Sequence, residues 1–313
     1  MEWKVRAKEL VENNIKSGLG KRYDDVSRQL KEELDVDVSP EVIRYHIVKK
    51  QNIEAKRKSE EKVLVLSDMH IPFHRPEEIL SIIEQHKNKV DTIIFAGDIV
   101  DCEAISVFDR VHKADLAKEM IESYHFLKKI DKMTPNAKKI MIWGNHEYRF
   151  IRYLASNGGE LSSLMSQNIL NEIVGGFTYT DWNSCVSVEF EPLSDNFHVQ
   201  DNWFVQYHDM VVAHPKNFSK IPLRTATSSC DYFFAQGIDF QAVLIGHTHK
   251  FGLTKHNTKY VAEIGCLCQE MAYASSGNIN YRPQEYGYAL VHFDDGIFNF
   301  DKSRFINLQL DRG

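Results

Sequence analysis

The chain has 313 residues, of which 43% are hydrophobic and 26% charged, with a formal net charge of −6. This balance excludes a disordered chain, and the length exceeds that of a single average domain. No apolar stretch approaches the roughly 18 residues that a membrane span needs, and the first residues lack a signal-peptide core. The cysteines are odd in number and lack paired zinc-site spacing, so we expect reduced thiols and a cytoplasmic protein. They are Cys102, Cys185, Cys230, Cys266 and Cys268.

Residues 1–58 are predicted to form a separate helical domain. Apolar residues recur at helical spacing from Trp3 to Ile15, from Tyr23 to Leu34 and from Val42 to Ile47, with Ser39 as the N-cap of the last helix. Two short helices across a tight turn resemble a helix-turn-helix, whose last helix enters the DNA major groove. We therefore expect DNA as a partner, although any small three-helix bundle shares this pattern. The side chains expected to face DNA are Arg44, His46, Lys49 and Lys50.

Residues 59–313 are predicted to form a second domain, in which short apolar runs alternate with helices. The runs read as strands buried on both faces. They are Lys62–Ser67, Thr92–Ala96, Lys139–Trp143, Met210–Ala213 and Ala242–Ile245. Helices are predicted at Pro76–Lys87 and Ala114–Ile130, which implies a largely parallel sheet with its site at the carboxyl ends of the strands. Residues 175–206 alternate as β-hairpins do, and residues 286–300 predict the final strands.

Five polar clusters follow these apolar runs. They are Asp68-Met69-His70, Gly97 to Asp101, Gly144 to Glu147, His214, and Gly246 to His249. Each cluster alone has an ordinary explanation, since Gly-Asp and Gly-Asn pairs are turn signals. Their occurrence together at the ends of successive strands brings Asp, Asn and His side chains to one edge of a sheet. The sequence therefore predicts a hydrolytic site for phosphate esters that holds two metal ions.

These clusters resemble those of the calcineurin-like metallophosphoesterase superfamily, over about residues 62–295. The resemblance implies an α/β fold of two mixed β-sheets sandwiched between helices. It also implies a dinuclear metal centre in which Asp98 bridges the two ions. The first ion would be bound by Asp68, His70 and His249, and the second by Asn145, His214 and His247. His208 competes with His214, but it lies inside an apolar run that His214 ends.

Two metals about 3.5–4 Å apart lower the pKa of a shared water and stabilise both the attacking and the leaving oxygen. The resemblance implies a metal-bridging hydroxide as the nucleophile and His146 as the general acid, with Asp101 orienting it. Asp101 could equally be a first-turn helix residue. Ligands without a thiolate favour Mn²⁺, with Fe or Zn²⁺ as alternatives. Glu147 and Arg149 are expected to be supporting or structural, and His74 to be either an exposed loop residue or a substrate contact.

The favoured function is a DNA-directed phosphodiesterase, a nuclease delivered to DNA by its N-terminal helices. The alternative is a phosphomonoesterase acting on nucleotides or phosphoproteins, with the N-terminal unit as a structural dimerisation module. A DNA-binding regulator that has lost catalysis is a third class, and the complete ligand set argues against it. We expect no membrane partner, and a homo-oligomer is compatible with the sequence.

Overall fold

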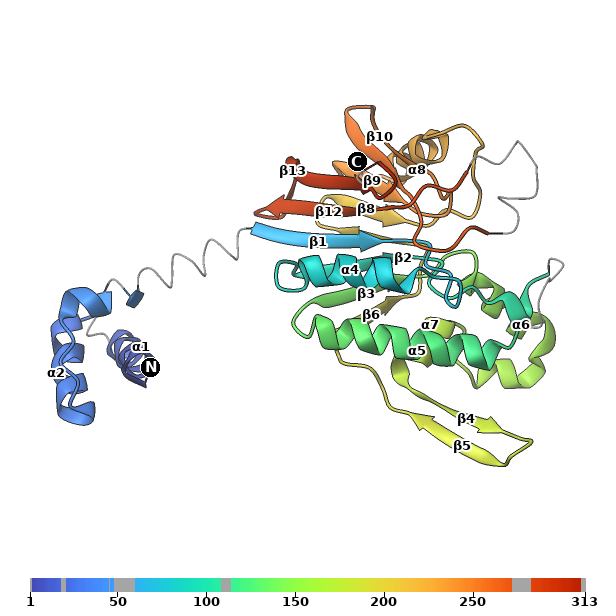
Figure 1. Cartoon of the computed structure of the whole chain (residues 1–313). Coiled ribbons are helices and arrows are strands. Elements are labelled where there is room, and N and C mark those ends of the chain that lie inside the picture. Colours follow the sequence, from blue (N-terminus) through green and yellow to red (C-terminus); the bar gives the residue numbers. More distant parts are fainter. Residues whose placement is uncertain are drawn as a thin grey trace. The chain divides into compact units, whose positions relative to one another are not determined.

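The computed structural model describes residues 2–17, 21–44, 46–47, 60–107, 114–271 and 283–310. The chain divides into two compact units, Met1–Glu60 and Glu61–Gly313 (Figure 1). Each unit has its own hydrophobic core, and the two are described separately below.

The described residues of the N-terminal unit include three helical segments. They are α1 (Glu2–Lys16), α2 (Tyr23–Leu34) and residues 40–44 with 46–47. Their apolar faces form a core that includes Leu10, Leu30 and Ile43. Arg44 is exposed, whereas the ring of His46 is partly buried near Trp3, with the ring centroids 5.9 Å apart. Lys49 and Lys50 lie outside the described residues, so the DNA-contacting set stays a prediction.

The larger unit contains a six-stranded sheet in the order β13-β12-β1-β2-β3-β6. Strands β1, β2, β3 and β6 are parallel, and β12 and β13 form an antiparallel pair. The bounds are β1 Glu60–Leu66, β2 Thr92–Ala96, β3 Lys138–Ile142, β6 Phe197–Gln200, β12 Gly287–Asp294 and β13 Ile297–Asn307.

A second sheet has five strands in the order β10-β11-β9-β8-β7. Strands β8, β9 and β11 are parallel, while β7 and β10 add antiparallel edges. The bounds are β7 Phe204–Tyr207, β8 Met210–Ala213, β9 Ala242–Ile245, β10 Phe251–His256 and β11 Lys259–Ile264. Both sheets are therefore mixed, as the sequence predicts.

The two sheets pack against each other, and helices cover their outer faces (Figure 1). Alternate residues of β1 show why: Val63 and Val65 face the second sheet, whereas Leu64 and Leu66 face helices. Helices α4, α5, α6 and α7 cover the first sheet, and α8 covers the second. The bounds are α4 Pro76–His86, α5 Leu116–Met133, α6 Glu147–Asn157, α7 Ile169–Gly175 and α8 Arg224–Ala235. The predicted sandwich of two mixed sheets between helices is confirmed.

The predicted hairpin region is divided among three sheets. Strands β4 (Phe177–Asp181) and β5 (Val186–Phe190) form a separate antiparallel pair, while β6 and β7 join the edges of the two large sheets. Short 3₁₀ turns lie at η1 (Glu103–Ile105) and η2 (Gly159–Ser163). Among the described residues, no helix is long and apolar enough to cross a membrane.

Candidate metal centre

The predicted metal ligands meet where the carboxyl ends of five strands converge. Asp68 and His70 follow β1, Asp98 follows β2, and Asn145 follows β3. From the second sheet, His214 follows β8, and His247 and His249 follow β9. A backbone hydrogen bond joins the loops after β1 and β2, since His70 N–H donates to Asp98 O at 2.8 Å. The parallel strands thus bring residues from Asp68 to His249 to one edge.

One half of the cluster contains Asp68, His70 and His249. His249 Nε2 lies 3.1 Å from both Asp68 Oδ1 and His70 Nε2. His70 Nδ1 donates to Asp101 Oδ1 at 2.8 Å, which leaves Nε2 directed at the other ligand atoms. Two nitrogens about 2.0–2.1 Å from a single ion can lie this far apart. This geometry fits one metal ion.

The other half contains Asn145, His214 and His247. His214 Nε2 lies 3.2 Å from Asn145 Oδ1, and its Nδ1 donates to Ala96 O at 2.7 Å. His247 can join Asp98 and His214 around one ion, because their ligand atoms all lie within 4.8 Å of one another. His247 Nε2 is buried and has no hydrogen-bond partner among the described residues, as expected of an atom that binds a metal.

Asp98 lies between the two halves. Its Oδ2 is 3.1 Å from His214 Nε2 and 3.6 Å from His70 Nε2, while Oδ1 accepts from the His146 backbone N–H at 2.9 Å. One carboxylate oxygen thus faces both sets of ligands. This is the position that the resemblance assigns to a bridging carboxylate.

The backbone at the site adopts conformations that are rare for residues other than glycine. Positive φ angles between 49° and 76° occur at five of the seven predicted ligands. They are Asp68, His70, Asp98, His247 and His249. Each costs on the order of 1–3 kcal/mol and persists only where the surroundings enforce it, typically at functional sites. Gly97, with φ +82°, is required for close packing, since a Cβ there would lie 2.6 Å from the His214 ring.

The charges within the cluster also fit bound cations. Burial raises the pKa of Asp68, but the positive charges of His214 and His249 lower it to about 2. Burial lowers the pKa of His214, whereas the carboxylates of Asp98 and Asp68 raise it to about 10. Burial and the charge of His214 lower the pKa of His247 to about 3, leaving a neutral ring. Divalent ions would neutralise the buried carboxylates and let every histidine bind through a free lone pair.

Glu147 holds two site loops together. Its Oε1 accepts from the N–H groups of Ile99 and Val100 at 2.7 and 2.9 Å. Its Oε2 accepts from the N–H groups of Asp98 and Gly144 at 3.1 and 2.8 Å. Burial and the charge of Asp98 raise the Glu147 pKa, while the backbone donors lower it. The side chain therefore fixes the loop that carries Asp98 to the loop that carries Asn145.

Asp101 connects His70 to His146. It lies between them, since His146 Nδ1 is 3.0 Å from Asp101 Oδ1 and donates to Asp101 O at 2.8 Å. Burial raises the Asp101 pKa, but hydrogen bonds from His146 and His70 lower it well below its usual range. The predicted orienting contact is thus present, and Asp101 lies before the 3₁₀ turn η1, outside any α-helix.

Arg149 contacts the proposed general acid directly. One guanidinium nitrogen donates to His146 Nε2 at 3.0 Å, and another donates to Asp101 O at 3.0 Å. Burial lowers the pKa of His146, whereas Asp98 and Asp101 raise it above the ordinary value. His146 therefore lies beside the metal ligands, and Arg149 keeps its ring in place.

Two histidines lie outside the ligand set, and the sequence prediction is wrong for one and agrees with the structure for the other. The prediction of an exposed His74 is wrong: only 5% of the residue is exposed, and its ring packs on Phe126 with the centroids 4.3 Å apart. Helix α5, which carries Phe126, covers the loop. His208 pairs with Glu61, with His208 Nε2 2.6 Å from Glu61 Oε2. The preference for His214 over His208 agrees with the geometry.

Sequence reasoning missed one group at the cluster. Cys268 Sγ lies within 4.8 Å of ligand nitrogens of His70 and His249, although the site was expected to lack sulfur. All five cysteines are free. The available signal was that Cys268 closely follows β11, a position like that of the predicted ligands after their own strands.

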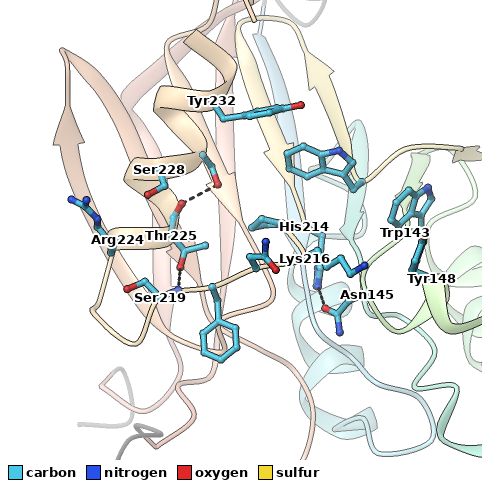
Figure 2. Close-up of a pocket in the computed structure, with 15 residues that line it drawn as sticks. Trp143, Asn145, Tyr148, His214, Lys216, Ser219, Arg224, Thr225, Ser228 and Tyr232 are labelled. Atoms are coloured by element: carbon cyan, nitrogen blue, oxygen red, sulfur yellow. Dashed lines mark hydrogen bonds between the residues drawn. The ribbon is translucent and has the colours of Figure 1, made fainter. Parts of the chain in front are cut away.

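A cavity of about 700 Å³ opens beside the second half of the cluster (Figure 2). Asn145 and His214 line it, and aromatic and basic side chains form much of the remainder. These are Trp143, Tyr148, Trp203, Phe218, Tyr232, Lys216 and Arg224. Trp143 stacks on Tyr148 with centroids 5.5 Å apart, and Lys216 Nζ lies 4.8 Å from the Tyr148 ring centroid. No pattern in the sequence predicts this cavity.

The fold and the cluster define a metallophosphoesterase. A model of the calcineurin-like phosphoesterase family matches residues 61–251, and the chain belongs to this family. It is therefore a metal-dependent hydrolase of phosphoester bonds, with a dinuclear metal requirement that the two halves of the cluster fit.

Several solved structures are similar to the chain. An archaeal protein described as a novel phosphodiesterase has 15% identity and a TM-score of 0.34, covering 79% of this chain and 99% of that one. Zn²⁺-complexed Vps29 of Entamoeba histolytica has 14% identity and a TM-score of 0.37, covering 79% and 98%. A metallophosphoesterase from Sphaerobacter thermophilus has 12% identity and a TM-score of 0.36, covering 79% and 88%. No curated protein matches the chain.

Proposed function

We propose that this protein is a phosphodiesterase that cleaves DNA. The observation that carries the proposal is the cavity beside Asn145 and His214, which combines aromatic walls with basic side chains. Its volume of about 700 Å³ lies within the range of small-ligand sites. Aromatic rings stack on nucleobases with about 1–3 kcal/mol per base, and Lys and Arg attract phosphates.

The two sides of the cavity suit different parts of a nucleotide. Trp143 and Tyr148 form one wall, and Tyr232 lies on α8 on the other side (Figure 2). Lys216 and Arg224 are exposed, so both cations can meet a backbone phosphate from solvent. A base held between these walls would place its phosphate next to Asn145 and His214.

The chain's own residues then have separate roles. Bound metal ions would supply an activated water and polarise the phosphoryl oxygens. His146, oriented by Asp101 and protonated at Nε2 from solvent, gives that proton to the leaving oxygen. For this the Arg149 hydrogen bond to His146 Nε2 must be released, and an anionic phosphate provides a competing acceptor for the guanidinium. Arg149 would thus couple substrate arrival to protonation of His146.

A phosphomonoesterase acting on nucleotides is the alternative, because a single cavity also holds a mononucleotide. The first experiment compares Mn²⁺- and Zn²⁺-loaded protein on single-stranded DNA, duplex DNA, bis-p-nitrophenyl phosphate and p-nitrophenyl phosphate. The proposal predicts cleavage of DNA and of the diester. Turnover of monoesters alone would replace the nuclease with a phosphatase.

A second experiment tests the cavity. Tyr232→Ala and Trp143→Ala should raise KM for an oligonucleotide about 5- to 150-fold, which corresponds to about 1–3 kcal/mol of lost stacking. Turnover of bis-p-nitrophenyl phosphate should change little. Trp182→Ala is the matched control, since Trp182 is 85% exposed and does not line the cavity. Equal effects on both substrates would mean that the aromatic walls do not bind a base.

A further inference from the structure

The loop that follows β11 is paired with the loop that follows β1. Leu267 N–H donates to Asp68 O at 3.0 Å, and Arg75 N–H donates to Leu267 O at 3.0 Å. Next along the chain, Cys268 forms an antiparallel bridge with His74. Backbone pairing on both sides of Cys268 therefore holds its side chain beside the metal ligands of the first half.

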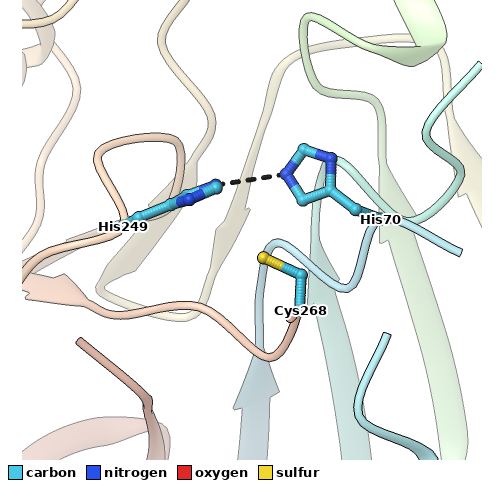
Figure 3. Close-up of side chains that lie close together, drawn as sticks. All are labelled: His70, His249 and Cys268. Atoms are coloured by element: carbon cyan, nitrogen blue, oxygen red, sulfur yellow. Dashed lines mark hydrogen bonds between the residues drawn. The ribbon is translucent and has the colours of Figure 1, made fainter. Parts of the chain in front are cut away.

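Cys268, His70 and His249 form a buried group (Figure 3). Their ligand atoms lie within 4.8 Å of one another, and the two Nε2 atoms are 3.1 Å apart. A nitrogen about 2.0–2.1 Å and a sulfur about 2.3 Å from one ion can lie at most about 4.4 Å apart. A small adjustment of the Cys268 side chain therefore satisfies the geometry of a shared ion.

A hydrogen-bond donor lies next to the sulfur, whereas its contact with Cys266 and its burial raise the pKa of the Cys268 thiol, so a bound cation is what would make it a thiolate. Gln284 Nε2 donates to Cys268 Sγ at 3.3 Å and to Cys266 Sγ at 3.4 Å. Hydrogen bonds of this kind commonly support metal-bound ligands. Cys266 differs because its thiol faces Glu285 O at 3.6 Å, and it belongs to none of the metal-capable groups among the described residues.

We infer that Cys268 binds the first metal ion as a thiolate, together with Asp68, His70 and His249. The thiol proton passes to the buffer when the sulfur binds. The second half contains Asn145, His214 and His247 and receives no sulfur, so the first site has a softer set of ligand atoms than the second. A thiolate favours Zn²⁺, Fe²⁺ or Co²⁺ over Mn²⁺, which revises the metal expected in the first site. The inference depends on the metal centre and does not depend on DNA being the substrate.

X-ray absorption at the Zn edge of the Zn²⁺-loaded full chain tests this directly. We expect a sulfur neighbour at about 2.3 Å in the wild type and in Cys266→Ser, and its loss in Cys268→Ser. With Co²⁺, the near-ultraviolet thiolate charge-transfer band should follow the same pattern. Zn²⁺ affinity of Cys268→Ser should fall at least as far as the roughly 10- to 100-fold seen when a supporting residue is lost.

The possible results of these experiments distinguish a failure of the Cys268 assignment from a failure of the dinuclear metal centre. Two bound metal ions per chain with no sulfur neighbour would overturn the role of Cys268 and leave the dinuclear centre intact. Loss of the sulfur signal in Cys266→Ser with retention in Cys268→Ser would also overturn it. If Cys268→Ser does not fold, retention of the signal in Cys266→Ser still supports Cys268, and its absence from the wild type refutes the inference.

Discussion

Glu147 should be essential to the site although it binds no metal in this account. Its two oxygens each accept two backbone N–H groups, so Glu147→Gln replaces one acceptor with an amide NH₂ that faces two donors. Leaving a buried donor unsatisfied costs about 1–3 kcal/mol, which gives about 2–6 kcal/mol for the two donors. The loops that carry Asp98 and Asn145 should then separate.

Equilibrium urea unfolding of chelator-treated protein measures this effect without a contribution from metal binding. At a constant m value, the midpoint should fall by that free energy divided by m. Glu189→Gln is the control, because Glu189 is exposed on β5 and should stay within about 0.5 kcal/mol of wild type. A Glu147→Gln shift no larger than that of the control would refute the structural reasoning.

Three further predictions address catalysis, pH and the N-terminal unit. His146→Ala should keep both metals by elemental analysis and lose about 10²–10⁴ in rate on DNA, with a smaller loss on p-nitrophenyl diesters; equal losses on both would remove the general-acid role. Burial raises the pKa of Glu119, 3% exposed, from 4.5 to about 7. The protonated side chain thus contributes on the order of 3 kcal/mol to the free energy of unfolding, in full below pH 4.5 and lost as the pH rises through about 7. Glu119→Gln should therefore flatten the pH dependence of stability measured by thermal unfolding. An unchanged slope would contradict the assignment. Deleting residues 1–58 should leave diester turnover almost unchanged and sharply weaken DNA binding, whose affinity in the full chain should fall with a log–log salt slope of about −0.9 per phosphate contacted; DNA binding equal to that of the full chain would exclude the N-terminal unit as a DNA-binding part.

The strands were predictable because their residues are buried on both faces. Thr92–Ala96, Met210–Ala213 and Ala242–Ile245 have the predicted bounds, since each is a short apolar run with turn residues close by. The ligands after these strands were predictable for a related reason. The parallel neighbours β1 and β2 end at the same edge, so Asp68 and Asp98 meet although they are far apart in the sequence.

Contacts set by loop packing were not predictable. Cys268 reaches His70 because residues around Leu267 pair with the backbone near Asp68, and no local pattern encodes that pairing. His74 is buried because Phe126 on α5 packs over it. The contact between Arg149 and His146 was easier to predict. The two residues are three positions apart at the start of α6, where helical spacing places them on one face.

Metal stoichiometry tests the central claim most directly. The chelator-treated full chain should regain phosphodiester hydrolysis as Mn²⁺ or Zn²⁺ is added and should bind two ions per chain. Asp98→Asn should lose both ions together with activity, because one Asp98 oxygen faces His70 and His214 alike. Hydrolysis by the metal-free protein, or two ions retained in Asp98→Asn, would contradict the account.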